Sequence, residues 1–113
     1  MIAITGGSGF IGSVLAWRLN ALGEKDLLIV DQGAKDAPKW NNIKKRAFSL
    51  YLDSDVFLKR LEDGEWDGKV RATFHMGACS DTTEMDKAYL KRNNTDYSER
   101  IAGWCLKNNV YLA

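Results

Sequence analysis

The sequence predicts a doubly wound α/β fold, in which a parallel sheet carries helices on both faces. Short apolar runs alternate with helical patterns along the chain, which is typical of strands joined by right-handed helical crossovers. The unbroken apolar run at residues 27–30 indicates a strand that is covered on both faces. With 113 residues, of which 45% are hydrophobic, the chain is expected to form one domain, 1–113, and not two.

The first half of the chain contains three predicted strands. After the strand at residues 1–5, a glycine turn opens a helix that runs to Leu22 and stops at Gly23. An apolar stripe is expected to pack this helix on the sheet, and it consists of Ile11, Leu15, Leu19 and Leu22. The second strand, 27–30, ends at Asp31, and a long polar loop with one helical turn leads to the third strand, 47–52.

The second half continues the alternation. Asp53 or Ser54 is expected to cap a short helix that ends at Gly64. A fourth strand covers residues 70–76, and a truncated fifth begins at 110–113. Between them we predict two helices separated near Asn93 and Asn94, the first over 83–91 and the second with the buried residues Tyr97, Ile101, Trp104 and Cys105.

Composition favours a small ligand over a polyanion. The 16 basic and 15 acidic residues leave a net charge of +1, so neither nucleic acid nor a membrane surface is expected as a partner. Cys79 and Cys105 lie far apart and His75 is the single histidine, which argues against a disulfide framework or a metal site. No signal peptide or membrane span is evident, and we expect a cytoplasmic protein.

The strongest local signal is the run Thr-Gly-Gly-Ser-Gly-Phe-Ile-Gly at residues 5–12. Gly6, Gly9 and Gly12 allow a tight turn, close approach to a pyrophosphate and close packing of helix on strand. Phosphate oxygens would meet N–H groups at the positive end of the helix. A Walker-type loop is excluded, because Ser13 stands where lysine is required. The competing interpretation is a glycine-rich turn without a ligand.

An acidic residue at the end of the next strand accompanies this motif. Asp31 lies 19 positions after Gly12, where a carboxylate accepts hydrogen bonds from the adenosine ribose hydroxyls of NAD. The alternative is a capping or turn aspartate. Lys35 and Lys39 follow in the loop and could instead hold the 2′-phosphate of NADP, unless they are simply solvated. These residues leave NAD and NADP both open.

The fourth strand ends at the same edge of the sheet with the run Phe-His-Met-Gly-Ala, residues 74–78. We interpret His75 as a packed or hydrogen-bonded structural residue. Cys79 is interpreted as a small residue lining a turn, since no base can be paired with it. Asn93 would either cap a helix or reach the cofactor. No catalytic residue and no metal ligand is assigned.

These motifs resemble a known family. Residues 5–12 are typical of extended short-chain dehydrogenase/reductases, the NAD-dependent epimerases and dehydratases, whose cofactor domain is Rossmann-like. The run His-Met-Gly-Ala-Cys-Ser-Asp-Thr-Thr-Glu at residues 75–84, followed by the two asparagines, is narrower. It resembles the ADP-L-glycero-D-manno-heptose 6-epimerases over essentially the whole chain.

The resemblance implies a set of cofactor contacts. Phe10 and Ile11 would join the glycines, Asp31 and Gln32 would meet the ribose, and Lys39 would hold the 2′-phosphate of NADP. The other implied contacts are Met76, Gly77, Ala78, Cys79, Ser80 and Asn93.

Three departures from the family pattern keep NAD possible. Gln32 stands where asparagine is common, and the loop before Lys39 is one residue longer. Ser54 stands where a second lysine is expected.

The resemblance also implies an activity for the whole enzyme, which would be an isomerase. It would invert C6 of ADP-glycero-manno-heptose by transient oxidation and re-reduction, for the heptose of the lipopolysaccharide core. In this family the Tyr-x-x-x-Lys pair follows the fifth strand, and none of Tyr89, Tyr97 and Tyr111 has such a lysine. The resemblance therefore implies that residues 1–113 are an incomplete NAD(P)-binding domain without the C-terminal substrate domain, and they are expected to be inactive alone.

We also expect a homo-oligomer. The alternatives are another nucleotide-sugar epimerase or dehydratase of the same group, and a non-catalytic NAD(P)-binding protein.

Overall fold

The computed structural model describes residues 1–32, 40–76 and 87–113, with the backbone alone for residues 87–95. Within these residues, five parallel strands form one sheet in the order β3-β2-β1-β4-β5. The strands are β1 (Ile2–Thr5), β2 (Leu27–Asp31), β3 (Leu50–Asp53), β4 (Ala72–His75) and β5 (Tyr111–Leu112). The helices are α1 (Phe10–Ala21), α2 (Trp40–Ile43), α3 (Ser54–Glu62) and α4 (Lys87–Lys107). The predicted doubly wound α/β fold is confirmed.

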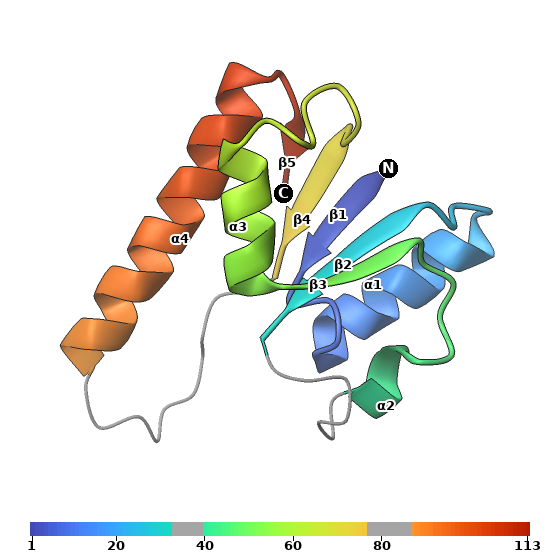
Figure 1. Cartoon of the computed structure of the whole chain (residues 1–113). Helices are drawn as coiled ribbons and strands as arrows, with labels where there is room; N and C mark the ends of the chain where they lie inside the picture. The colour runs from blue at the N-terminus through green and yellow to red at the C-terminus, as the bar shows by residue number, and fades with distance from the viewer. Residues whose placement is uncertain (33–39, 77–86) are drawn as a thin grey trace.

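The strand order places the helices in two layers (Figure 1). From β1 the chain moves through β2 to β3 and then crosses back to β4, on the other side of β1. Since crossovers between parallel strands are right-handed, α1 and α2 lie on one face of the sheet and α3 and α4 on the other. The reversal between β1 and β4 is the topological switch point, where open sheets of this class bind ligands.

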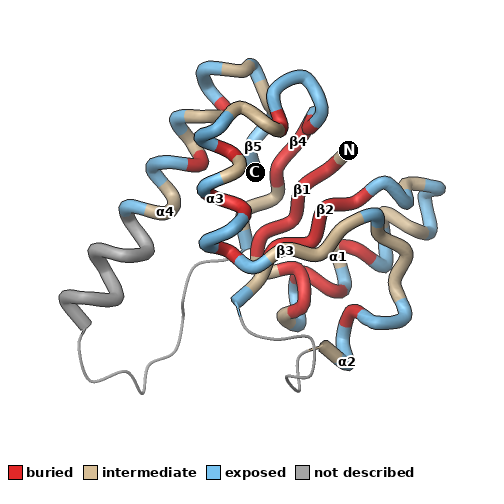
Figure 2. Tube along the Cα trace, viewed as in Figure 1, coloured by how far each residue is buried: buried red, intermediate tan, exposed pale blue. Residues whose placement is uncertain are grey.

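The central strands consist mostly of buried residues (Figure 2). Residues 27–30 are all 0% exposed, which explains their unbroken apolar run. On one face Phe57 of α3 and Ile101 of α4 belong to the core cluster. On the other face Ala16 of α1 and Ile43 of α2 belong to a second cluster. The sheet therefore forms the middle layer between two apolar interfaces.

The expected apolar stripe of α1 is partly wrong. Leu15 and Leu19 do pack against the core, but the side chains of Ile11 and Leu22 are 68% and 65% exposed. The buried positions of α1 are instead the small residues Gly12, Ser13 and Ala16. Small side chains bring the helix close to the sheet, and the contact face is therefore rotated away from the largest side chains.

The boundaries of several other elements also differ from the prediction. The strands β3 and β4 are shorter than expected. Asp53 is confirmed as the cap of α3, because its carboxylate accepts from the Asp55 N–H at 3.1 Å. The prediction of two helices separated near Asn93 and Asn94 is wrong, since α4 passes through both. An asparagine costs a helix at most about 0.7 kcal/mol relative to alanine, which is too little to interrupt it.

Candidate cofactor-binding site

The described candidate residues gather at the carboxyl edge of β1, β2 and β4. The glycine turn follows β1, Asp31 ends β2 and Met76 follows β4. In the strand register Thr5 lies opposite both Val30 and His75, so the three strands end within one residue of one another. The Met76 N–H donates to the Thr5 carbonyl at 3.0 Å, which ties the end of β4 to the start of the turn. Three segments far apart in sequence thus form one edge.

Backbone hydrogen bonds define the shape of the turn. Gly6 adopts a left-handed φ of 67°, which favours glycine. The Gly7 N–H donates to the Val30 carbonyl at 3.2 Å, and the Gly9 N–H donates to the Gly6 carbonyl at 3.1 Å. The first helical bond of α1 runs from the Ser13 N–H to the Gly9 carbonyl at 2.9 Å. The N–H groups of residues 10–12 therefore have no acceptor within the helix and are available to an anion.

The glycines also allow the helix to pack closely on the turn. A Cβ on Gly12 would lie 2.3 Å from the Gly6 carbonyl oxygen and 2.8 Å from the Gly7 Cα, so the helix packs directly on the turn. A Cβ on Gly9 would lie 3.3 Å from that same oxygen. The first turn of α1 contains no acidic residue that would repel a phosphate. A tight turn at Gly6 and close packing at Gly12 are two of the roles that glycines have in dinucleotide-binding turns.

The carboxylate of Asp31 is bonded directly to the glycine turn. Its Oδ2 atom accepts from the Ser8 N–H at 3.0 Å and from the Ser8 hydroxyl at 2.6 Å. Its Oδ1 atom accepts from the Gln32 N–H at 2.7 Å. Motif reasoning placed Asp31 beside the ribose but missed the role of Ser8. The signal available in the sequence was a serine between two glycines, and the structure shows that Ser8 is 0% exposed.

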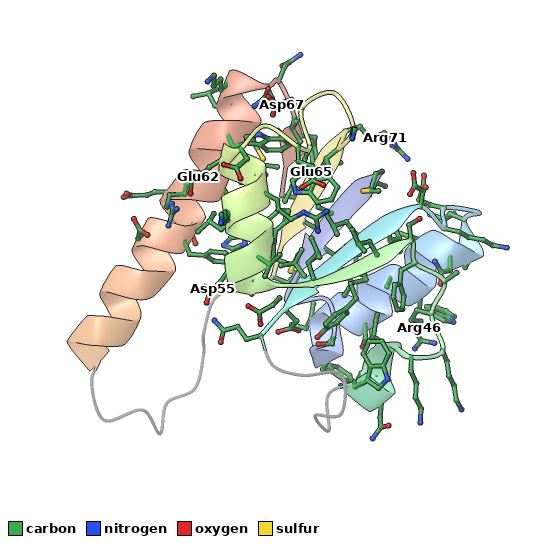
Figure 3. The ribbon with its side chains drawn as sticks, in the orientation of Figure 1. Arg46, Asp55, Glu62, Glu65, Asp67 and Arg71 are labelled. Atoms are coloured by element: carbon green, nitrogen blue, oxygen red, sulfur yellow. The ribbon has the colours of Figure 1, made fainter. Side chains whose placement is uncertain are left out.

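Two further residues hold the turn and the start of α1 from the side of α2. The Asn42 side-chain amide donates to the Ser8 carbonyl at 3.1 Å. Arg46, on the side of the sheet that carries α1 and α2 (Figure 3), donates from Nε to the Ser13 carbonyl at 3.3 Å. Nothing local in the sequence shows that this loop returns to the glycine turn, so the contact of Asn42 could not be predicted from it.

His75 is hydrogen-bonded at both ring nitrogens, as its structural interpretation expects. Nδ1 lies 2.6 Å from the Thr5 hydroxyl oxygen and Nε2 lies 2.8 Å from the Ser98 hydroxyl oxygen. The ring of Tyr97 stands 5.4 Å away, centroid to centroid. Burial raises the pKa of Tyr97 to about 12, so this phenol stays neutral near pH 7. The cluster joins α4 to β1 and β4 beneath the carboxyl edge.

Protonation of His75 is expected to destabilise the fold. Burial lowers the pKa of His75 in the folded chain, so the unfolded chain binds this proton more readily. The contribution of His75 to the free energy of unfolding should therefore be fully present above pH ~6.5, the unfolded pKa of histidine. The free energy of unfolding should decrease as the pH falls below that value. Urea unfolding at several pH values between 7.5 and 5.5 would measure this dependence.

The control for this experiment is His75→Asn, which removes the only histidine of the chain. The variant should show a flatter pH dependence across the same interval, whatever its absolute stability. Equal slopes for the variant and the unaltered chain would contradict the assignment.

The other expected contact residues divide into three groups. Phe10 and Ile11, at the start of α1, are 80% and 68% exposed, and Met76 is 39% exposed. Gln32 is also exposed. Asn93 lies in α4, but its side chain is among those that the structure does not describe. Five expected contacts lie outside the described residues: Lys39, Gly77, Ala78, Cys79 and Ser80.

Two searches restricted to the described residues bear on other kinds of site. No group of three or more histidine, cysteine or acidic side chains there could hold a metal ion. None of the helices there combines the length and hydropathy needed to span a bilayer.

A doubly wound sheet with a three-glycine turn at its switch point defines a dinucleotide-binding protein. The chain belongs to the NAD dependent epimerase/dehydratase family, whose model matches residues 2–113. It is 43% identical over 110 residues to the ADP-L-glycero-D-manno-heptose-6-epimerase of Fusobacterium nucleatum. That match covers 97% of this chain but 33% of the relative, so the chain spans about a third of the curated relative's length.

Solved structures share the fold. The ADP-L-glycero-D-manno-heptose-6-epimerase of Helicobacter pylori superposes with a TM-score of 0.74 at 23% identity, over 98% of this chain and 37% of that one. The Bordetella bronchiseptica enzyme WbmG, in complex with NAD and UDP, gives a TM-score of 0.72 at 23% identity, over 96% of this chain and 34% of that one.

Proposed function

We propose that this chain is the cofactor-binding part of an isomerase that inverts C6 of ADP-glycero-manno-heptose, with NADP as its cofactor. The observation that carries the proposal is the 43% identity to the F. nucleatum epimerase across nearly the whole chain. The geometry of the glycine turn supports it, because its amide groups and its close packing suit a pyrophosphate.

The chain would hold the cofactor along the carboxyl edge of the sheet. The N–H groups at the start of α1 would bind the pyrophosphate, Asp31 and Gln32 would meet the ribose, and Lys39 would meet the 2′-phosphate. The contacts further along would be Phe10, Ile11, Met76, Gly77, Ala78, Cys79, Ser80 and Asn93. When bound, the nicotinamide supplies the hydride acceptor and donor that inversion at C6 requires.

The proposal extends to the biological setting of the complete protein. It would be a cytoplasmic homo-oligomer that supplies heptose for the lipopolysaccharide core. Within the 113 residues, neither Tyr89 nor Tyr97 is followed by lysine at the fourth position. We therefore propose that these residues bind the cofactor without turning over substrate, and that the acid/base pair belongs to a part of the protein outside them.

The test is turnover of ADP-D-glycero-D-manno-heptose by the complete gene product loaded with NADP. We expect conversion to the L-glycero epimer, followed by proton NMR of the heptose, together with saturable binding of NADP in calorimetry. UDP-glucose and UDP-N-acetylglucosamine serve as control substrates. If a control sugar is turned over and the heptose is not, the protein is a different nucleotide-sugar enzyme. If the cofactor binds but no sugar is turned over, the protein is a non-catalytic binding protein.

A further inference from the structure

We propose that Ser8 is a specificity-determining residue of the cofactor site. Its hydroxyl and its backbone N–H together hold the Asp31 carboxylate at the ribose position, and they thereby set the affinity of the site for NAD relative to NADP. This inference rests on the proposed function, because it requires a nicotinamide dinucleotide in the glycine turn.

The carboxylate of Asp31 is held from two directions. Ser8 donates twice to Oδ2, from its N–H at 3.0 Å and from its hydroxyl at 2.6 Å. The Gln32 N–H donates to Oδ1 at 2.7 Å. Donors on both oxygens define the plane of the carboxylate as well as its position. Rotation of the side chain would break the two bonds to Ser8.

Ser8 is itself fixed in place. It is 0% exposed, so its hydroxyl has no competing bulk water. The side-chain amide of Asn42 donates to the Ser8 carbonyl at 3.1 Å, which anchors the residue to α2. The neighbouring Gly7 bonds to the carbonyl of Val30, the residue before Asp31. The turn and the end of β2 therefore form one hydrogen-bonded unit.

The charge on this unit decides which cofactor it favours. Ribose hydroxyls donate to a fixed carboxylate, whereas a 2′-phosphate carries about two negative charges and has only acceptors to offer it. A 2′-phosphate on the ribose would repel the Asp31 carboxylate, and the bonds to Ser8 oppose movement of the carboxylate away from it. Removing the hydroxyl deletes the shorter of the two bonds to Oδ2, so the carboxylate is held less firmly and the affinity for NADP should rise relative to the affinity for NAD. A lysine such as Lys39 would act separately, by attracting the phosphate.

The experiment compares the dissociation constants of NAD and NADP for the complete gene product and its variants by calorimetry. Ser8→Ala is expected to shift the NAD-to-NADP affinity ratio about tenfold toward NADP, the size associated with one hydrogen bond to a charged group. The matched control is Ser49→Ala. Ser49 donates to Asp26 Oδ1 at 2.7 Å, just before the opposite end of β2, and its loss should leave the ratio unchanged.

A double variant separates this role from a merely structural one. If Ser8 acts through Asp31, then Ser8→Ala should shift the ratio in the unaltered protein but not in an Asp31→Ala background. Ser8→Cys, which replaces the hydroxyl by a poorer donor, should shift the ratio in the same direction and serves if the alanine variant does not fold.

The results that would overturn the role of Ser8 differ from the result that would overturn the proposed function. A shift that persists in the Asp31→Ala background, or no shift in either Ser8 variant, would overturn the role of Ser8 while leaving the cofactor site standing. Absence of binding of both NAD and NADP by the unaltered, folded protein would instead overturn the proposed function.

Discussion

Replacing Gly12 with alanine is expected to abolish cofactor binding and to lower the free energy of unfolding by roughly 3 kcal/mol, the upper range for overpacking. The added Cβ would lie 2.3 Å from the Gly6 carbonyl oxygen and 2.8 Å from the Gly7 Cα. Both are backbone atoms, so neither can move aside as a flexible side chain would. The start of α1 must shift, and its N–H groups then lose their alignment for the pyrophosphate.

Urea unfolding and calorimetric titration with NADP and NAD would measure the two effects of Gly12→Ala. Gly103→Ala is the control, because a Cβ at Gly103 meets nothing within 4 Å. Gly103 lies within α4, where alanine is favoured over glycine by about 1 kcal/mol, so this variant should bind normally and be slightly more stable. Unaltered cofactor affinity in Gly12→Ala would show that this turn does not hold the pyrophosphate.

Replacing Asp31 with alanine is expected to weaken NAD binding about 100-fold, which corresponds to about 2.7 kcal/mol for two hydrogen bonds from ribose hydroxyls to a charged group. The variant also removes the acceptor for the Ser8 N–H and hydroxyl. Because Ser8 is buried, these donors would lose their partner away from water, and the fold should be less stable as well. NADP binding should be weakened less than NAD binding.

Calorimetry with both cofactors measures this prediction, and Asp26→Ala is the matched control. Asp26 precedes the opposite end of β2, where its carboxylate accepts from the Ser49 hydroxyl at 2.7 Å and lies 3.6 Å from the N-terminal ammonium group. Like Asp31→Ala, Asp26→Ala removes a carboxylate that accepts from a serine hydroxyl, but it does so far from the carboxyl edge of the sheet. Equal loss of affinity in the two variants would show that Asp31 acts through general stability and not through the ribose.

The fold class was predictable because its signals are local. The run at residues 27–30 is apolar because both faces of β2 are covered, and the glycines at 6, 9 and 12 mark the change from β1 to α1. The errors arose where tertiary packing overrides a local preference. The helix α4 passes through Asn93 and Asn94, and α1 turns small residues to the sheet while Ile11 faces solvent.

For the candidate site, local sequence determined which residues turn, begin a helix or end a strand, and so it identified the glycine turn and Asp31. It could not identify their partners, because those depend on strand register and on where loops return. Ser8 meets Asp31 across 23 positions, and Asn42 meets Ser8 across 34. Only the folded sheet, with β1 beside β2 and α2 packed behind them, brings these groups within hydrogen-bond distance.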